Sequence, residues 1–279
     1  LLEKSFAGIN LEDLSSPKCY DIEDTLKATM NIPVFHDDQF GTAIAALAGV
    51  LGGLRLIGKK LDEVKVVVNG VGAAGSAIAR LFLEAGVPAE NMTALNSKGI
   101  LYDNGHLDRI QKALADKLNP EGRRGTLADA VKGADVLVGC SGPGVFTKEI
   151  VSTMAEKNIV FGMANPVPEM MLDEAREAGV YVFGTGRSDM PNQINNSSVF
   201  PGLFRGALDV RARQINEEMK LAAAYALANL MSDDELDPDH VVADVFDERV
   251  PKAVAKAVAK AAIETGVARV KELPEQYRD

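Results

Sequence analysis

Residues 64–80 of the chain read VKVVVNGVGAAGSAIAR, and the fold prediction starts from this segment. The apolar run 64–68 predicts a buried strand, and the pattern over 76–85 predicts a helix. Between them, Gly70, Gly72 and Gly75 have the spacing G-x-G-x-x-G. In a turn from strand to helix, these glycines permit a sharp bend, close approach of a pyrophosphate and tight packing of the helix. The stretch therefore predicts a dinucleotide site at a helix N-terminus, with an ordinary glycine-rich turn as the alternative.

The composition is that of a globular chain with a sizeable core. Of its 279 residues, 47% are hydrophobic and 25% charged, which suggests one large domain or two ordinary ones. The formal net charge of −10 argues against nonspecific binding to nucleic acid or to an anionic membrane. The longest apolar run, 43–54, is too short to span a bilayer, and we recognise no signal peptide. Cys19 and Cys140 have no metal or redox spacing, which predicts free thiols in a reducing, cytoplasmic compartment.

Strand and helix patterns alternate along most of the chain. Further strands are expected at 91–95, 135–140, 159–163 and 180–183. Helices are expected at 21–30, 43–57, 107–118, 126–132, 147–157, 172–178, 214–231 and 251–271. Asp21 is a plausible cap of the first helix, and Thr42 of the second. This alternation predicts an α/β fold, in which a doubly wound parallel sheet is flanked by helical segments of a second domain.

The end of the second strand of the sheet bears on the choice of cofactor. Asn96 lies 21 residues beyond Gly75, where the fingerprint places Asp or Glu on the ribose 2′-hydroxyl. Asn96 and Ser97 would repel a 2′-phosphate less than an acid would, and Lys98 offers a positive charge to pair with it. This favours NADP slightly over NAD. Asn96 as an ordinary loop residue is an equally open interpretation.

Four carboxylates follow two short apolar segments near the start of the sequence. Glu12 and Asp13 follow one of them, and Asp37 and Asp38 lie in an expected turn after the other. None belongs to a helical i,i+4 ladder or to a run of charges. Oxygen ligands suit Mg²⁺ or Mn²⁺, and the sequence has no His/Cys cluster for zinc. A metal site is one interpretation, and helix caps or surface charges are the other.

Five strings in this chain resemble malic enzyme of the small bacterial or archaeal type. They are GINLEDL at 8–14, IPVFHDDQFGTA at 32–43, the GVGAAG turn, ANPVPE at 164–169 and TGRSDMPNQINN at 185–196. The resemblance runs from about residue 8 to about residue 270. It implies oxidative decarboxylation of L-malate to pyruvate and CO₂, with NAD or NADP and Mg²⁺ or Mn²⁺ as cofactors. It also implies a homodimer or a larger homo-oligomer.

The resemblance assigns roles to the acidic residues. Glu12, Asp13 and Asp38 would hold the metal ion, with Asp37 beside them in the site. Asp37 and Asp38 are thereby the candidate catalytic residues of this chain.

Two asparagines and the glycine turn complete the candidate site. Asn165 of ANP and Asn196 of the Asn-Asn pair would contact malate or the nicotinamide end of the cofactor. Ser141 lies in another glycine turn at a strand's C-terminal end, where ligands bind in such sheets. The candidate cofactor-binding residues are Gly70, Val71, Gly72, Ala73, Ala74, Gly75, Asn96, Ser97, Ser141 and Asn165.

The resemblance also divides the chain. Residues 38–195 would form the dinucleotide-binding domain, residues 1–37 and 196–240 part of a metal and substrate domain, and residues 241–279 a C-terminal helical segment. The family's catalytic tyrosine and lysine lie upstream of GINLEDL, and none of the five tyrosines here matches their motif. We therefore expect a polypeptide of these 279 residues to bind dinucleotide but to turn over malate negligibly.

Two other functions stay open at this point. One is a Rossmann dehydrogenase of the amino-acid or methylene-tetrahydrofolate type, in which the four carboxylates would have no role. The other is a noncatalytic nucleotide-binding module. Three further side chains carry structural expectations: a packed, hydrogen-bonded His36, an Arg187 that meets either an ion-pair partner or an anionic ligand, and a solvated Lys220.

Overall fold

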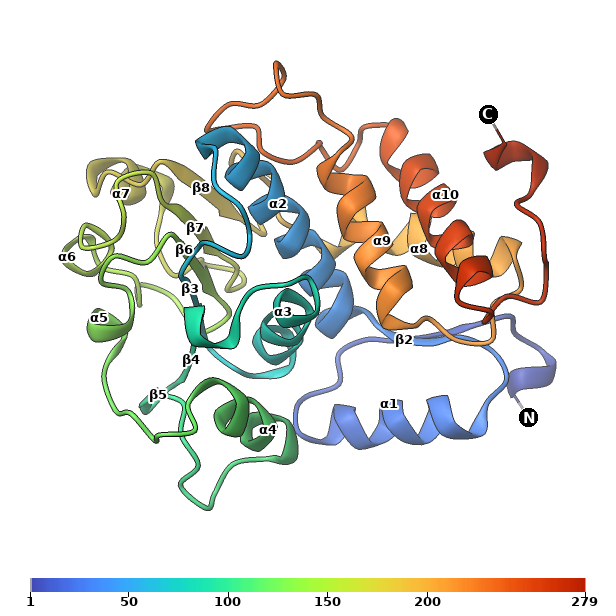
Figure 1. Ribbon diagram of the computed structural model, residues 1–279, viewed down its shortest axis with the longest axis horizontal. Helices are drawn as coiled ribbons and strands as arrows, with labels where there is room; N and C mark the ends of the chain where they lie inside the picture. Colours follow the sequence, from blue (N-terminus) through green and yellow to red (C-terminus); the bar gives the residue numbers. More distant parts are fainter. Residues whose placement is uncertain (1, 279) are drawn as a thin grey trace.

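The computed structural model describes residues 2–278, and its six-stranded sheet lies in the left half of the molecule as drawn in Figure 1. The strand order is β5-β4-β3-β6-β7-β8, and all neighbours are parallel except β5, which pairs antiparallel with β4. The strands are β3 (Val66–Asn69), β4 (Met92–Asn96), β5 (Gly99–Ile100), β6 (Val136–Gly139), β7 (Ile159–Gly162) and β8 (Val182–Thr185). The predicted α/β fold is confirmed. Because β4 and β6 lie on opposite sides of β3, the strand order reverses there, and the crevice outside the carboxyl ends is where such sheets bind ligands.

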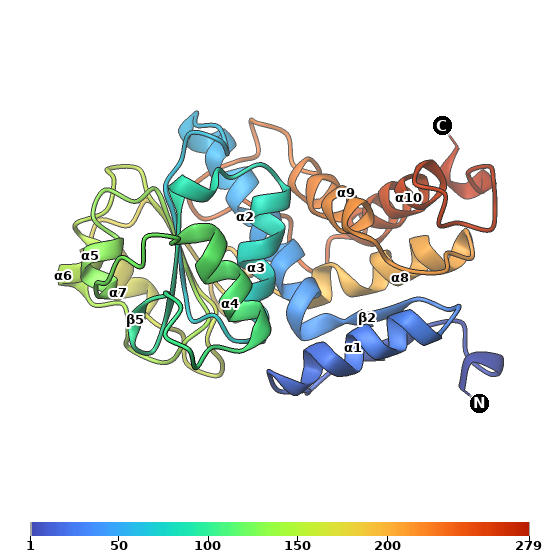
Figure 2. The same cartoon turned by 60° about the horizontal axis from the view of Figure 1, so that its bottom comes forward.

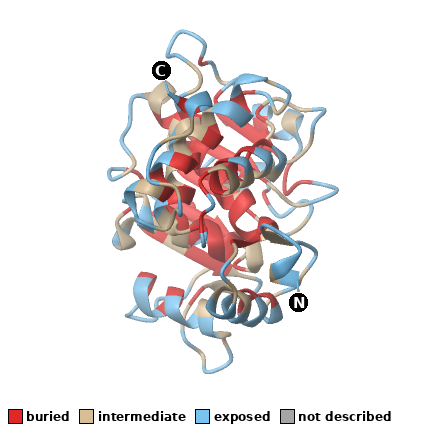
Figure 3. Cartoon of the chain, turned by 90° about the vertical axis from the view of Figure 1, so that its right-hand side faces the viewer, coloured by how far each residue is buried: buried red, intermediate tan, exposed pale blue. Residues whose placement is uncertain are grey.

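Helices cover both faces of the sheet. The larger core contains Val66 and Val68 of β3 and the helices α2 (Thr42–Ile57) and α3 (Ala73–Glu84). Val67, between those two valines, points to the other face. There the smaller core holds α5 (Leu127–Ala130), α6 (Lys148–Val151) and α7 (Leu172–Glu177). Figure 3 shows the buried residues gathered on the sheet and on the helices packed against it.

Helix α2 is the buried centre of the larger core. Eleven of its 16 residues are buried, in agreement with its apolar composition. The segment Asp37–Ile57 is long and apolar enough to cross a membrane by length and composition alone. However, 72% of its most apolar window is buried inside the protein, as is typical of a core helix.

The remaining elements form a second group beside α2. Helices α8 (Phe200–Asp209), α9 (Glu217–Ala228) and α10 (Arg249–Glu264) pack together, and α9 also packs on α2 (Figure 2). Strands β1 (Ile9–Leu11) and β2 (Val34–His36) pair in parallel, with α1 (Lys18–Thr29) beside β2. Helix α4 (Arg109–Leu118) packs on α3. Short 3₁₀ turns lie at Leu2–Lys4, Ala89–Asn91, Asn196–Ser198 and Glu275–Tyr277.

Several predicted boundaries were wrong for local reasons. Helix α1 begins at Lys18, so Asp21 lies inside it and is not its cap. The helix expected at 147–157 is only the single turn Lys148–Val151. The last helix ends at Glu264 instead of residue 271, because Gly266 takes a left-handed conformation (φ +74°) that ends a helix.

The acidic turn also differs from its prediction. Asp37–Gly41 is a π-helical segment that continues directly into α2. Gly41, not Thr42, stands at the N-cap of α2, and it has no side chain to cap the helix. Asp37 and Asp38 are therefore held by a rigid helical turn that is anchored in the core.

Candidate active site

The glycine turn has the geometry that its sequence predicts. Gly70 has a φ of +102°, and a Cβ there would lie 2.4 Å from the Cys140 carbonyl oxygen. A Cβ on Gly75 would lie 2.0 Å from the Gly70 carbonyl oxygen, so helix α3 packs directly on the turn. A Cβ on Gly72 would meet no atom of residues 2–278 within 4 Å. Gly72 therefore faces open space, where a ligand can approach the backbone.

The N-terminus of α3 is free to receive an anion. Gly72 is its N-cap, and no side chain caps the helix. The N–H groups of Gly70 and Val71 donate instead to the Leu95 carbonyl, at 2.9 and 3.1 Å. The anion-facing N–H groups of the turn are thus those from Gly72 onward.

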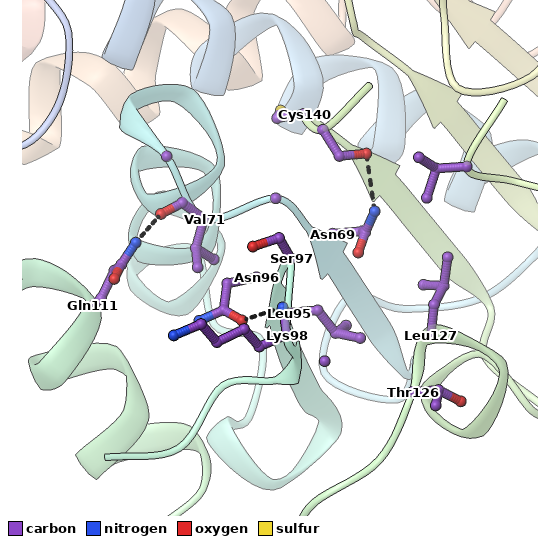
Figure 4. Close-up of a pocket in the computed structure, with 15 residues that line it drawn as sticks. Asn69, Val71, Leu95, Asn96, Ser97, Lys98, Gln111, Thr126, Leu127 and Cys140 are labelled. Carbon is purple, nitrogen blue, oxygen red and sulfur yellow. Dashed lines mark hydrogen bonds between the residues drawn. The ribbon is translucent and has the colours of Figure 1, made fainter. Parts of the chain in front are cut away.

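A pocket of about 550 Å³ opens over this turn (Figure 4). Its walls include Asn69 at the end of β3, Asn96 and Lys98 after β4, and Gln111 of α4. Gln111 Nε2 donates to the Val71 carbonyl oxygen at 3.0 Å, which fixes α4 against the turn. The volume suits a cofactor-sized ligand.

Lys98 brings a positive charge to the end of the pocket where we predict the adenosine ribose of the cofactor. The Asn96 side chain accepts the Lys98 N–H at 2.9 Å, which makes a tight turn between β4 and β5. Lys98 and Ser97 are exposed at this end. Among the described residues that line the pocket there is no Asp or Glu.

A second pocket of about 380 Å³ continues from the first. Cys140 and Ser141 line both pockets. The second pocket also brings together Asp38, Asn165 and Asn196, three predicted site residues that are far apart in the sequence. Ala74 of α3 lines it as well, so the glycine turn borders both spaces.

Strand pairing brings the two acidic segments together. Leu11 of β1 is in register with His36 of β2, so Glu12 and Asp37 leave the two parallel strands at the same end. The Asp13 N–H donates to Asp38 Oδ2 at 2.8 Å, with Asp13 in a left-handed conformation (φ +58°). The acidic residues of the two segments are therefore neighbours, as a shared site requires.

Asp37 lies at the most buried point of this acidic cluster. It is 5% exposed, and its Oδ2 accepts a hydrogen bond from Asn196 Nδ2 at 2.6 Å. Its Oδ1 is buried without a partner among the described residues. Burial raises the pKa of the Asp37 carboxyl to about 6, which the nearby charges of Glu12 and Asp38 favour and the Asn196 hydrogen bond opposes.

The metal-ligand set is only partly assembled. Glu12 and Asp37 line a small pocket of about 250 Å³, whereas Asp38 faces the larger second pocket. In residues 2–278, no group of three or more His, Cys, Asp or Glu side chains is arranged to hold a metal ion. The backbone thus brings the predicted ligands together, but Glu12 and Asp38 line two different pockets, and Asp13 lines neither of them.

The chain matches known proteins over nearly its whole length. A family model described as the NAD-binding domain of malic enzyme matches residues 40–263. The bifunctional malic/malolactic enzyme of Bacillus subtilis is 53% identical over the whole chain, which covers 68% of that relative. This chain belongs to the malic enzyme family.

Further relatives in the malic enzyme family include users of both cofactors. The NAD-dependent malic enzyme of Geobacillus stearothermophilus is 49% identical over 97% of the chain and 56% of its own length. The NADP-dependent malic enzyme of Escherichia coli is 44% identical over 96% of the chain and 37% of its own length. The chain thus spans between 37% and 68% of these curated relatives.

Solved malic enzyme structures have the same fold. The malic enzyme of Entamoeba histolytica superposes with a TM-score of 0.94 at 40% identity, over 99% of this chain and 59% of that one. The malic enzyme of Pyrococcus horikoshii has a TM-score of 0.90 at 45% identity, over 96% of this chain and 64% of that one.

Three single-residue expectations have different outcomes. Lys220 was expected to be solvated, but it is 1% exposed, and its Nζ lies 3.4 Å from the centre of the Phe40 ring. His36 is buried as expected, but neither ring nitrogen has a partner among the described residues. Arg187 makes a two-pronged ion pair with Asp189, at 2.7 and 2.8 Å.

Glu169 was not predicted as a site residue. This side chain is fully buried beneath the loops that carry Ser141 and Asn165. A signal was present, because Glu169 closes the string ANPVPE. A lone acidic residue after two prolines does not by itself indicate burial.

Proposed function

We propose that this chain carries the dinucleotide site and part of the substrate site of an enzyme that oxidatively decarboxylates L-malate to pyruvate and CO₂. The observation behind the proposal is the wall that two pockets share: Cys140 and Ser141 border both the cofactor pocket and the pocket of Asp38, Asn165 and Asn196. A dinucleotide seated on the glycine turn would reach this second pocket with its nicotinamide end. The nicotinamide would accept hydride from malate C2. The names of relatives, which are NAD- and NADP-dependent malic enzymes, support this reaction.

The side chains of the second pocket would bind and orient malate. Asn165 and Asn196 carry amide groups that donate to carboxylate oxygens and accept from a hydroxyl. Because Asn196 already donates to Asp37, its amide is fixed relative to the acidic turn. A substrate held by these amides would meet the acidic groups in one preset geometry, which is the main contribution of such positioning residues.

We assign the divalent metal, Mg²⁺ or Mn²⁺, to Glu12, Asp13 and Asp38, with Asp37 beside them. All four offer oxygen ligands, which hard cations prefer. The buried Asp37 Oδ1, which has no hydrogen-bond partner among the described residues, is an acceptor that a nearby cation would compensate. When bound, the metal would polarise the C2 oxygen of malate as a Lewis acid and orient the substrate.

We further propose that NADP is preferred over NAD. Asn96 stands where an acid would bind the ribose hydroxyls of NAD, and among the residues described around the pocket no carboxylate would repel a 2′-phosphate. Lys98 lines the same end and offers a cation to that phosphate.

The resemblance assigns the proton-transferring tyrosine and lysine to a segment upstream of residue 8. We therefore propose that a polypeptide of these 279 residues binds dinucleotide but turns over malate negligibly, since general acid–base groups contribute roughly 10²–10⁴-fold each. Brisk malate-dependent reduction of NAD or NADP by that polypeptide would contradict this proposal. A cytoplasmic homo-oligomer without nucleic-acid or membrane partners completes the proposal.

One titration tests the proposed function. NAD and NADP are each titrated into the protein with and without Mn²⁺ and malate. We expect dinucleotide binding without metal and a malate effect on affinity only when Mn²⁺ is present. Dinucleotide binding that never responds to malate with Mn²⁺ would instead favour a noncatalytic nucleotide-binding module. A malate effect that is indifferent to Mn²⁺ would overturn the metal assignment.

A further inference from the structure

A buried carboxylate joins the two loops that separate the cofactor pocket from the second pocket. Glu169 is completely inaccessible to solvent. Its Oε1 accepts hydrogen bonds from the backbone N–H of Ser141 at 2.7 Å and from the Ser141 hydroxyl at 3.0 Å. Its Oε2 accepts the backbone N–H of Ala164 at 3.0 Å. In the part of the chain that the structure describes, no Lys, Arg or His forms an ion pair with Glu169, so these three donors hold the carboxylate.

The two loops leave neighbouring strands at the same edge of the sheet. Ser141 follows β6 and Ala164 follows β7, and the last residues of these strands, Gly139 and Gly162, are register partners. A Cβ on Gly139 would lie 2.6 Å from the Glu169 carboxyl carbon, and one on Gly162 would lie 3.4 Å from Glu169 Oε2. The paired glycines therefore leave the space in which the carboxylate sits. The two glycines and the hydrogen bonds of Glu169 together place its carboxylate between the ends of β6 and β7.

Each loop carries groups that face the proposed ligands. The Ser141 hydroxyl also accepts from Asn69 Nδ2 at 3.0 Å, and both residues line the cofactor pocket. Ala164 precedes Asn165, and both line the second pocket together with Ser141. A shift of one loop against the other would change the passage between the two pockets and leave the glycine turn in place.

We propose that Glu169 is a positioning residue that sets the spacing of these two loops, so that the nicotinamide end of the cofactor can pass into the pocket of Asn165. The inference rests on the proposed function, because it assumes a nicotinamide dinucleotide across the shared wall. Glu169 acts through Ser141 and Ala164 and does not touch the ligand. Its contribution is therefore specific to the half of the cofactor beyond Ser141.

The substitution Glu169→Gln tests this role with little change in size. A glutamine side chain has one acceptor oxygen, so its NH₂ group must face the N–H of either Ala164 or Ser141. One loop then loses its partner and meets a donor instead. Glu169→Asp is a second variant, because its acceptors remain but its shorter stem cannot reach both loops.

The measurement compares two ligands on the protein at its full natural length. One is whichever of NAD and NADP the wild type binds more tightly, and the other is the matching ADP-ribose or 2′-phospho-ADP-ribose, which lacks only the nicotinamide. In calorimetric titrations we expect Glu169→Gln to weaken the dinucleotide about tenfold and the truncated ligand less than about twofold. A residue that only stabilised the fold would weaken both ligands equally.

Asp135 provides a control at the other end of β6, immediately before the strand begins. It is also a buried carboxylate, and its Oδ2 accepts the Lys65 N–H at 2.8 Å. Asp135→Asn should lower the melting temperature without discriminating between the two ligands.

The outcomes separate this inference from the proposed function. If the wild type binds neither ligand, the proposed function fails. If the wild type binds both ligands and Glu169→Gln weakens them equally or not at all, the positioning role is overturned. Should Glu169→Gln not fold, Glu169→Asp must show the same selective loss, and its absence would overturn the inference.

Discussion

The cofactor pocket and the acidic turn beside it are built in opposite ways. The pocket combines the glycine turn and an uncapped helix N-terminus with uncharged polar side chains and Lys98, and no Asp or Glu lines it among the described residues. The acidic turn gathers several negatively charged side chains, and Asp37 Oδ1 is buried there without a hydrogen-bond partner in the described part of the chain. The first region offers backbone donors to an anion, whereas the second has a buried acceptor on Asp37 that a cation, a substrate donor or a proton would satisfy. We therefore expect the cofactor pocket to bind its ligand without help and the acidic turn to need a cation or substrate as a second component.

The largest expected effect comes from damaging the acidic turn while the cofactor pocket stays intact. Asp38→Asn keeps an acceptor for the Asp13 N–H but removes a ligand charge. In the enzyme at its full natural length, we expect malate turnover to fall at least ~100-fold, because even residues that only support metal ligands contribute about 10–100-fold. Dinucleotide affinity should stay within about twofold, since Asp38 does not line the cofactor pocket. Asp62→Asn, on an exposed carboxylate before β3, is the control. Normal turnover and metal affinity in Asp38→Asn would refute the assignment.

The cofactor pocket can be damaged without damaging the fold. Gly72→Ala adds a Cβ where nothing lies within 4 Å, so stability should change by less than about 0.5 kcal/mol. The same methyl group occupies the path of the pyrophosphate, and dinucleotide affinity should fall more than about tenfold. Gly75→Ala should instead lower stability by about 1–3 kcal/mol, because its Cβ would meet the Gly70 carbonyl oxygen. Thermal melting and calorimetry on both variants check this contrast, and unchanged binding by Gly72→Ala would contradict it.

The sequence predicted the first region better than the second because its signal is local. The glycine turn, the strand before it and the helix after it lie within residues 64–85, and Gly70 and Gly75 make the turn and the close helix packing that the sequence predicts. The contact of Asp37 with Asn196 joins residues 159 positions apart, which no periodicity encodes. The resemblance to malic enzyme supplied both residues, but not their hydrogen bond. The π-helical form of the acidic turn was also missed, since a short polar stretch between strand and helix looks like an ordinary loop.

Buried charges were the hardest feature to predict. Lys220 lies on the same face of α9 as Ala223, Ala224 and Leu227, so the apolar period did indicate burial. We nevertheless predicted a solvated Lys220, because lysine side chains are rarely buried in proteins. Glu169 has no comparable pattern, because its partners come from two loops that only the folded sheet brings together.

A smaller effect tests the absence of an acid at the ribose end of the cofactor pocket. Asn96→Asp should shift preference from NADP toward NAD by about tenfold, because a carboxylate repels the 2′-phosphate and accepts from the ribose hydroxyls. Asn104→Asp is a matched control. Asn104 makes the same kind of turn, in which its side chain accepts the His106 N–H at 2.9 Å, but it is not among the residues that line the pocket. The ratio of NADP to NAD affinity checks the prediction, and an equal shift in both variants would exclude a local effect.

The smallest expected effect concerns the charges behind the acidic turn. Lys220 Nζ donates to Glu217 at 2.6 Å and lies over Phe40, and the charges of Lys27 and Arg80 face the same ring. Burial lowers the pKa of Lys220 to about 8, although Glu217 opposes this shift. Below pH 8 the lysine is charged in both the folded and unfolded chains, so the full cost of burying the charge is present.

Above pH 8 the folded chain releases this proton while the unfolded chain keeps it up to its ordinary pKa. The free energy of unfolding should therefore rise with pH across that window. Lys220→Met removes the charge, so it should stabilise the protein by about 1 kcal/mol at pH 7, and this gain should shrink as the pH rises above 8. Lys260→Met, on the exposed side of α10, should show no such trend. Denaturant melts between pH 7 and pH 10 decide the matter: a Lys220→Met variant that is less stable at every pH would mean that the cation over Phe40 is a net support of the acidic turn.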